Sequence, residues 1–270
     1  MDKNIVKIAR IVRHNSKFEI LTRFGYISNG VLHGLIGLAV LSLVRGVAEE
    51  VDQSGVLAPL TRTAYGTILL LLISAGLVVL GISHFVRVIL MRKNPGADRK
   101  WPRQIGESAK GLAYLVVGVS SMAFIFAKAN EPNSVNSSID FTAHLLALPM
   151  GEALLLIIGL GIIALGINFI YRGVSRRFVG VLDFAKIKLK RPVIILGVIG
   201  YIAKGLTFIS LGSLFCNAAV TLNPSKASGL DGAFKNLIAL PFGAQLLLLL
   251  GLGLIVYAIY CVARGMYAKL

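Results

Sequence analysis

The chain has 270 residues, of which 56% are hydrophobic and only 15% are charged, and its formal net charge is +16. Soluble domains average about 45–50% apolar and about 25% charged residues, so this composition excludes an ordinary soluble protein. It also excludes a disordered chain, which is poor in apolar residues. We therefore expect an integral membrane protein with a strongly basic aqueous side.

Six stretches without Asp, Glu, Lys or Arg follow one another along the chain. A helix needs about 20 apolar residues to cross a hydrocarbon core of about 30 Å. Each stretch approaches or exceeds that length, and glycine is frequent inside them, as it is in membrane helices. They predict six transmembrane helices, within residues 24–44, 63–86, 111–127, 153–171, 205–225 and 236–263.

These stretches group into three pairs, which basic segments separate. The predicted segments are 1–22 (basic N-terminal segment), 23–92 (repeat 1), 93–103 (linker), 104–176 (repeat 2), 177–192 (basic linker) and 193–270 (repeat 3). Because Lys and Arg concentrate in the N-terminal segment and the two linkers, we expect these segments and both chain ends to be cytoplasmic. Nucleic acid is not expected as a partner, because the basic residues are spread over loops at helix ends.

Glycine positions recur in the three pairs, which indicates internal repeats. The first helices share one frame, at Gly25, Gly30 and Gly37, at Gly106, Gly111 and Gly118, and at Gly200, Gly205 and Gly212. The second helices share another, at Gly66, Gly76 and Arg87, at Gly151, Gly161 and Arg172, and at Gly243, Gly253 and Arg264. Each unit crosses the membrane twice, so the units have one orientation and are related by rotation about the membrane normal. We predict an all-α, six-helix bundle of three tandem hairpins with pseudo-threefold symmetry.

Several motifs resemble a bacterial membrane family known as a domain of unknown function, number 1206. They are Phe24-Gly25-Tyr26 with Asn29-Gly30, Gly200-Tyr201 with Ala203-Lys204-Gly205, residues 229–233, and residues 240–243 with Gly251 and Gly253. The resemblance covers about residues 18–270. It implies three tandem two-helix repeats in a bacterial inner (plasma) membrane, and it implies no established activity.

The first helices also carry a polar stripe at spacing i, i+3, i+7. It consists of Tyr26, Asn29 and His33, of Glu107, Lys110 and Tyr114, and of Tyr201, Lys204 and Phe208. If the stripes face one another, they line a basic funnel that opens to the cytoplasm and suits an anionic head group or a small anion. Glu107 can then pair with Lys110, and Lys204 lies below the ring of Phe208. Alternatively, both lysines extend their ammonium groups to the lipid head groups.

Two further sets of residues have predicted contacts. Small residues seven apart on one helix face allow close helix packing, and they include Gly30, Gly37, Gly111, Gly118, Gly205 and Gly212. Arg87, Arg172 and Arg264 end the second helices, where we expect them to bind lipid phosphate.

The loops that follow the third and fifth spans resemble each other. Each contains an aspartate, Asp140 or Asp231, followed by apolar residues at helical spacing and then a proline. We expect a short amphipathic helix on the outer face in each loop. The two aspartates are predicted to be the N-caps of these helices.

No motif for a nucleophile, metal or cofactor accompanies these residues, and the four histidines occur singly. We predict no catalytic residue, no metal, no cofactor and no enzymatic activity. The favoured function is a structural or interaction subunit that engages anionic membrane lipid, or a protein partner in the membrane or at its cytoplasmic face. The alternative is a carrier or binder of a small anion in the funnel, which is formed by Tyr26, Asn29, Glu107, Lys110, Tyr201 and Lys204.

Overall fold

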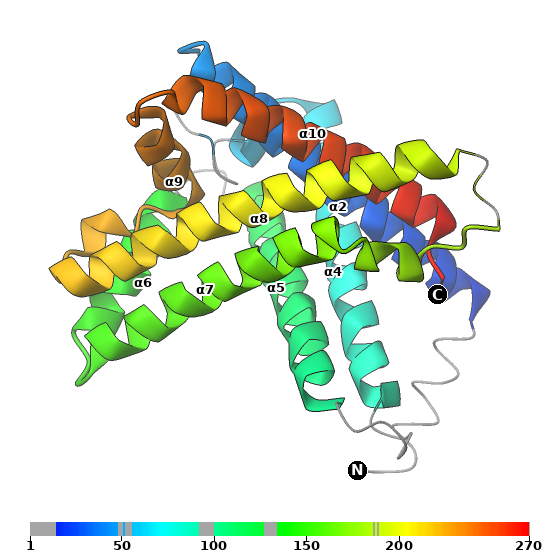
Figure 1. The fold of residues 1–270 in the computed structure, drawn as a ribbon, viewed down its shortest axis with the longest axis horizontal. Helices are drawn as coiled ribbons and strands as arrows, with labels where there is room; N and C mark the ends of the chain where they lie inside the picture. Colours follow the sequence, from blue (N-terminus) through cyan, green and yellow to red (C-terminus); the bar gives the residue numbers. More distant parts are fainter. Residues whose placement is uncertain are drawn as a thin grey trace.

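The computed structural model describes residues 15–47, 51, 56–91, 100–126, 134–185, 187 and 189–269. The predicted all-α fold is confirmed, since the only β-type pairing within these ranges is one isolated bridge between Leu182 and Ala268. The long helices are α2 (Ser16–Val44), α4 (Ala64–Met91), α5 (Lys100–Phe126), α7 (Gly151–Val174), α8 (Lys190–Thr221) and α10 (Gly243–Tyr267) (Figure 1). The predicted N-terminal segment and the first linker lie largely outside the described residues.

Five of these helices, α2, α4, α7, α8 and α10, are long and apolar enough to cross a bilayer. Large apolar side chains on the outside of the bundle fit contact with lipid; Ile157 and Leu249, for example, are each 65% exposed. These features indicate a membrane protein. Helix α5 has 27 residues and contains Glu107 and Lys110 in its first half. It is not among the five, so a sixth span stays a prediction.

Short helices precede the second helix of each repeat. They are η1 (Ala58–Arg62) before α4, α6 (Ser134–Leu146) before α7, and α9 (Gly229–Ile238) before α10. The two expected helices in the loops are therefore confirmed, but their predicted caps are wrong. Asp140 lies in the middle of α6, and Asp231 lies inside α9, whose N-cap is Ser228. Asp231 instead accepts a hydrogen bond from the Val51 backbone N–H at 2.9 Å.

The same turn starts the second helix of all three repeats. Gly66, Gly151 and Gly243 each lie so close to the carbonyl group six residues earlier that a Cβ atom would overlap its oxygen. Any other residue would push the short helix away from the long one. In repeats 2 and 3 the residue before this glycine, Met150 or Phe242, has a left-handed backbone with φ of 62° or 61°. Repeat 1 instead uses Thr63, whose Oγ1 accepts the Gly66 N–H at 3.1 Å.

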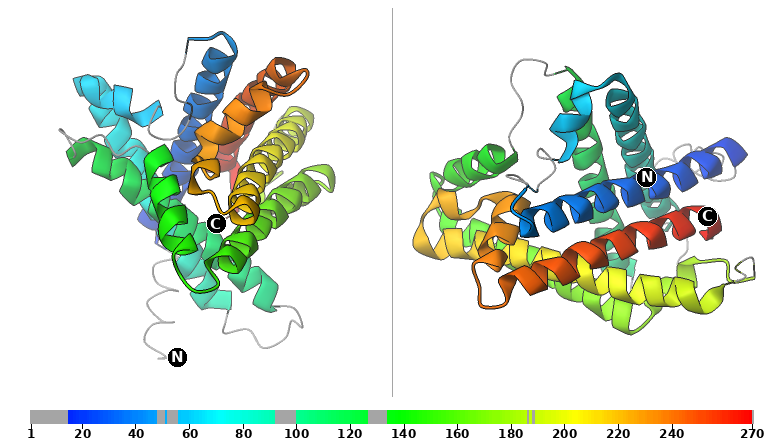
Figure 2. Two further views of the ribbon diagram at one scale, coloured as in Figure 1. Left: turned by 90° about the vertical axis from the view of Figure 1, so that its left-hand side faces the viewer. Right: turned by 90° about the horizontal axis from the view of Figure 1, so that it is seen from above.

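The most extensive helix packing joins neighbouring repeats. Helix α4 packs on α5, α7 packs on α8, and α10 packs on α2, so that the last repeat contacts the first. Figure 2 shows α2 and α10 lying side by side. Glycines lie at each of these contacts. A Cβ added at Gly37 would lie 2.8 Å from the Gly251 oxygen, one at Gly81 would lie 2.9 Å from the Gly111 oxygen, and one at Gly166 would lie 2.6 Å from the Gly205 oxygen. Such separations admit no side chain, so glycine fixes the approach of the two backbones.

Packing inside the repeats is uneven. Helix α2 packs on α4 and α8 packs on α10, but in the described part of repeat 2 the helices α5 and α7 make no comparable interface. Figures 1 and 2 show α5 running crosswise to α7. Pseudo-threefold symmetry therefore stays a prediction.

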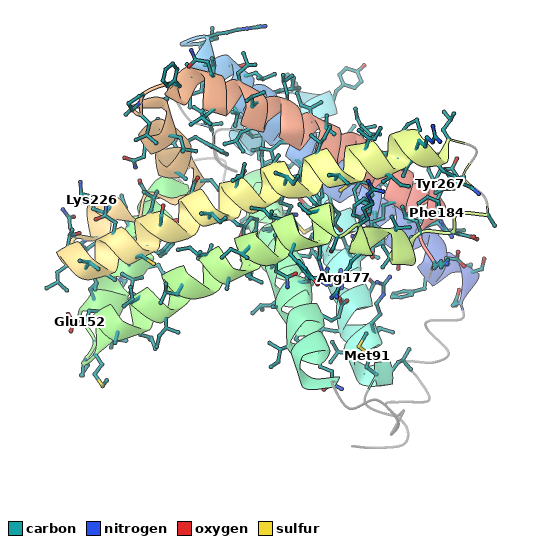
Figure 3. All side chains as sticks on the ribbon, viewed as in Figure 1. Met91, Glu152, Arg177, Phe184, Lys226 and Tyr267 are labelled. Carbon is teal, nitrogen blue, oxygen red and sulfur yellow. The ribbon has the colours of Figure 1, made fainter. Side chains whose placement is uncertain are left out.

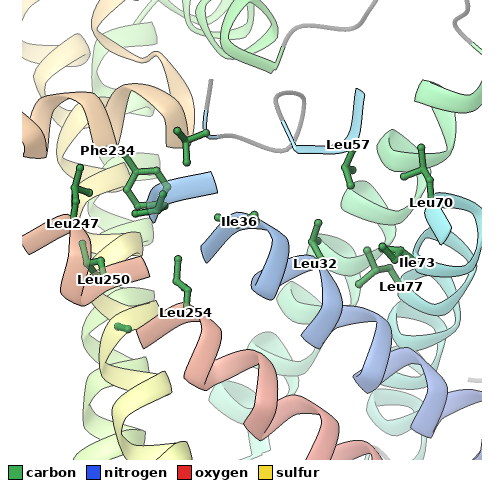
Figure 4. Close-up of a cluster of buried hydrophobic side chains, with 13 residues drawn as sticks. Leu32, Ile36, Leu57, Leu70, Ile73, Leu77, Phe234, Leu247, Leu250 and Leu254 are labelled. Atoms are coloured by element: carbon green, nitrogen blue, oxygen red, sulfur yellow. The ribbon is translucent and has the colours of Figure 1, made fainter. Parts of the chain in front are cut away.

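The largest apolar core lies between α2, α4 and α10. Leu32 and Ile36 of α2 face Leu77 of α4 and Leu254 of α10 across it, and Phe234 of α9 covers one end (Figure 4). This core joins α2, α4 and α10, which carry the buried polar residues Tyr26, Asn29, His84, Tyr257 and Cys261.

Candidate functional site

Buried polar side chains gather where α2, α8 and α10 meet. Tyr26 and Asn29 on α2, Lys204 on α8, and Tyr257 and Cys261 on α10 are each at most 6% exposed. A buried polar group is costly unless it finds a partner. The contacts of each of these residues therefore indicate what the site can bind.

Lys204 places its ammonium group among aromatic side chains. Its Nζ donates a hydrogen bond to the Tyr257 hydroxyl at 3.3 Å and lies 4.6 Å from the centre of that ring. The ring centre of Phe169 is 5.2 Å away, and that of Phe208 is 6.0 Å away, which confirms the predicted contact with Phe208. None of the ion pairs found between described residues includes Lys204. Its burial disfavours extension to the lipid head groups.

Asn29 occupies the equivalent position in repeat 1. Its Nδ2 donates to the Cys261 sulfur at 3.3 Å, and the Nδ1 atom of His33 lies 2.8 Å from its backbone oxygen. The His33 ring meets the edge of Tyr257 at a centroid distance of 4.9 Å. Asn29 is thus linked to Tyr257 through His33, and Lys204 contacts Tyr257 directly.

The third equivalent position, Lys110, belongs to an ionic group on α5. Lys110 pairs with Glu107, as the spacing predicted, and the Oε2 atom of Glu107 lies 2.7 Å from Nδ1 of His84 on α4. The His84 ring stacks on Tyr114 at 5.5 Å. The Lys110 side chain is 28% exposed, whereas His84 is buried.

Repeats 1 and 3 make a cross-repeat contact from the middle position of the polar stripe, whereas repeat 2 makes its contact from the first position, Glu107. The contacts are Asn29 with Cys261, Glu107 with His84, and Lys204 with Phe169. Each partner belongs to the preceding repeat and lies eight residues after the aligned glycine, Gly253, Gly76 or Gly161. This offset was available in the sequence, but sequence reasoning identified His84 only as a single histidine and missed Cys261 and Phe169.

Arg264 is turned into the bundle. Its guanidinium donates to the Tyr26 hydroxyl at 3.2 Å and lies 4.3 Å above the centre of that ring. The Nε atom is buried and has no hydrogen-bond partner among the described residues. Arg23 of α2 fixes the end of α10 by donating to the carbonyl oxygens of Gly265, Met266 and Ala268 at 3.1, 2.6 and 3.2 Å. Lipid phosphate binding by Arg87, Arg172 and Arg264 stays a prediction.

Several cations act on one another in this region. Lys204 lies within electrostatic range of Arg264 and Lys110, and Lys110 lies within range of Arg172 and Arg264. These residues come from α5, α7, α8 and α10, and one of them, Lys110, pairs with the carboxylate of Glu107. The arrangement leaves an excess of positive charge, which an anion would balance.

Tyr201 forms the aromatic wall beside these cations. Its ring centre lies 5.3 Å from that of Phe178, 5.6 Å from that of Tyr257 and 5.5 Å from that of Tyr260. No group of three or more His, Cys, Asp or Glu side chains that could hold a metal ion occurs in the described part of the chain. The contacts available to a ligand here are therefore cationic, amide and aromatic.

Comparisons with known proteins agree with the repeats. The family model described as Domain of Unknown Function (DUF1206) matches residues 24–90, 105–176 and 199–268. Each match lies inside one of the three predicted repeats. The chain is also 30% identical over 249 residues to the "Uncharacterized protein YxxB" of Bacillus subtilis strain 168, which covers 91% of this chain and 89% of that protein. No solved structure matches.

Proposed function

This chain belongs to the family described as Domain of Unknown Function (DUF1206), and from that premise we propose that it binds an anionic group inside the membrane at Lys204, Arg264 and Lys110. Asn29 adds an amide to this site, and Tyr26, Glu107 and Tyr201 position the cations. The site corresponds to the funnel that the polar stripes predict.

The proposed membrane arrangement has six spans, with α5 as the sixth, and both chain ends in the cytoplasm of a bacterial inner membrane. The exposed residues Arg176, Arg177 and Lys190, between α7 and α8, support this orientation, because basic loops stay cytoplasmic. In a closed ring of repeats, the three helix pairs are related by a pseudo-threefold axis along the membrane normal. The packing of α10 on α2 supports such a ring.

The observation that carries the proposal is the burial of Lys204, which pairs with no carboxylate in the part of the chain that the structure describes. Burying an ion costs several kcal/mol even after the protein relaxes, unless an opposite charge compensates it. An ammonium group has three hydrogens to donate, and Tyr257 accepts one of them. The free Nε of Arg264 adds another donor. Lysine and arginine together suit a phosphate group, which offers several acceptor oxygens.

The experiment separates the two sources of a phosphate group. Protein in nanodiscs of phosphatidylcholine is titrated with phosphatidylglycerol in one arm and with inorganic phosphate in the other, and bound molecules are counted by native mass spectrometry. Lys204→Met keeps the stem of the side chain but removes the charge, and it should weaken binding by roughly 10-fold or more, as for a lost charge-assisted hydrogen bond.

The matched control is Lys226→Met. Lys226 is exposed and lies at the opposite end of the α7–α8 pair from Arg177 (Figure 3). It should bind like the unmodified protein. Equal binding by Lys204→Met and the unmodified protein in both arms would overturn the proposal.

A second candidate function is an interaction subunit that uses the basic surface of Arg176, Arg177 and Lys190. All three residues are exposed. Neutralising them should then release an acidic partner or anionic vesicles, whereas Lys204→Met should leave that association intact. This pattern would favour the surface over the buried site.

A further inference from the structure

Four positions make the same contact between the two helices of repeat 1 and of repeat 3. In repeat 1, an added Cβ at Gly25 would lie 2.5 Å from the Gly76 oxygen and 2.9 Å from the Leu80 Cβ. A Cβ at Gly76 would lie 2.6 Å from the Ser28 Cβ. In this contact each glycine packs against a residue of the facing helix. Leu80, four residues after Gly76, packs on Gly25, and Ser28, three residues after Gly25, packs on Gly76.

Repeat 3 reproduces this contact at the aligned positions. A Cβ at Gly200 would lie 2.8 Å from the Tyr257 Cβ, and a Cβ at Gly253 would overlap the Cβ of Ala203. Ala203 and Ser28 are both three residues after the first glycine, and Tyr257 and Leu80 are both four residues after the second. The contact therefore follows from the repeat frame and not from local sequence.

Repeat 2 has all four residues but not the contact. The aligned residues are Gly106, Ala109, Gly161 and Leu165. A Cβ at Gly106 or at Gly161 would meet no atom of the described residues within 4 Å. Ala109 is exposed, and Leu165 is 44% exposed. Helices α5 and α7 thus each carry a face that could form this interface, but the two faces are not in contact.

We propose that the protein has a closed state in which α5 docks on α7, with Gly106 against Leu165 and Gly161 against Ala109. The occupant of each open face is the other helix of the same repeat, because that is the occupant in repeats 1 and 3. Small residues on both sides provide the close backbone approach that drives such docking in a membrane. Two packings of one helix pair can differ by only a few kcal/mol, which permits exchange between them.

Docking has a consequence for the buried cations. Asn29 and Lys204, whose own repeats are docked, are buried, whereas Lys110 is partly exposed. Closing α5 on α7 brings Leu165 towards Lys110, as Tyr257 lies against Lys204 in repeat 3. The closed state covers Lys110, and the open state exposes it. This inference does not depend on what the cations bind.

The test is disulfide formation in the full chain in native membranes. The first pair is Ala109→Cys with Gly161→Cys, and its matched control is Ser28→Cys with Gly76→Cys in repeat 1. The second pair is Gly106→Cys with Leu165→Cys, and its control is Gly25→Cys with Leu80→Cys. A disulfide needs a Cβ separation of about 3.5–4.5 Å, which a small separation of the docked helices provides. Peptide mass spectrometry identifies each disulfide and separates it from the natural Cys216 and Cys261.

We expect both repeat 2 pairs to form a disulfide within one chain. Acetylation of Lys110 by a water-soluble reagent should then slow severalfold, because Lys110 is partly exposed in the open state and becomes covered in the closed state. If the control pairs in repeat 1 form disulfides but neither repeat 2 pair does, the closed state is overturned. Disulfides that join two chains would also overturn it. Unchanged acetylation of Lys110 in the cross-linked protein would overturn its covering. Lys204→Met, which removes the proposed anion site, should cross-link normally, so failure of one proposal is distinguishable from failure of the other.

Discussion

Alanine at three aligned glycines should give two different results in one protein. At Gly253 the new Cβ would overlap the Cβ of Ala203. Carbon atoms in contact are about 3.5–4.0 Å apart, so α8 and α10 must separate by roughly 1 Å or more. Overpacking of this kind costs about 1–3 kcal/mol. Gly76→Ala should cost a similar amount, because its Cβ would lie 2.6 Å from that of Ser28.

Gly161→Ala is the matched control in repeat 2. Within the described ranges, no atom lies within 4 Å of the position that its Cβ would occupy. Alanine also favours a helix over glycine by about 0.8–1.0 kcal/mol in peptides in water. The stability of this variant should therefore stay unchanged or rise slightly.

The assay is thermal denaturation of the purified proteins in one detergent, followed by size-exclusion chromatography of the fraction that stays monomeric. A cost of about 1–3 kcal/mol should lower Tm by roughly 2–12 °C for Gly76→Ala and Gly253→Ala. Equal losses in all three variants would refute the reasoning, because they would show that repeat 2 is docked at rest. Circular dichroism checks that helix content is preserved.

Other predictions concern single contacts. Gly166→Val should destabilise the α7–α8 pair by about 1–3 kcal/mol, measured by the same Tm assay, because its Cβ would lie 2.6 Å from the Gly205 oxygen; an unchanged Tm would mean that the two helices are not in contact there. Lys204→Met should raise Tm while it weakens anion binding, because it removes a buried charge that no carboxylate of the described residues pairs with. A lower Tm would show that the charge is compensated. Asp231→Ala should cost about 1–3 kcal/mol, because the buried Val51 N–H loses its acceptor, and Asp231→Asn, which keeps a side-chain oxygen, should restore part of that loss.

The sequence predicted which segments form helices better than where they begin. Apolar stretches beginning at residues 111 and 205 predicted the third and fifth spans, whereas α5 begins at Lys100 and α8 at Lys190. The apolar stretch marks the part of a helix suited to the hydrocarbon, but lysine and glutamate are good helix formers and continue the helix beyond it. The boundary of a span and the boundary of a helix are therefore different quantities.

Glycine spacing identified the packing faces but not their partners. The stripe of Gly205 and Gly212 shows that one face of α8 accepts a close neighbour, and this fits any helix with a similar stripe. The structure selects α7, from the preceding repeat. The same limit applied to the site, because Asn29 and Lys204 were predicted from their own helices whereas Cys261 and Phe169 come from others. Pairing between distant helices depends on contacts between several helices at once, which a local pattern does not contain.

Because the last helix, α10, packs on the first, α2, the order of the three repeats along the chain should matter little for the fold. Helix α10 packs on α2 much as α7 packs on α8. A circular permutant that opens the chain in a loop between two repeats, and joins residues 1 and 270 by a short linker, should therefore keep the same fold. A lone copy, in contrast, would expose two bare glycine seams to lipid and would have to find sister copies to cover them.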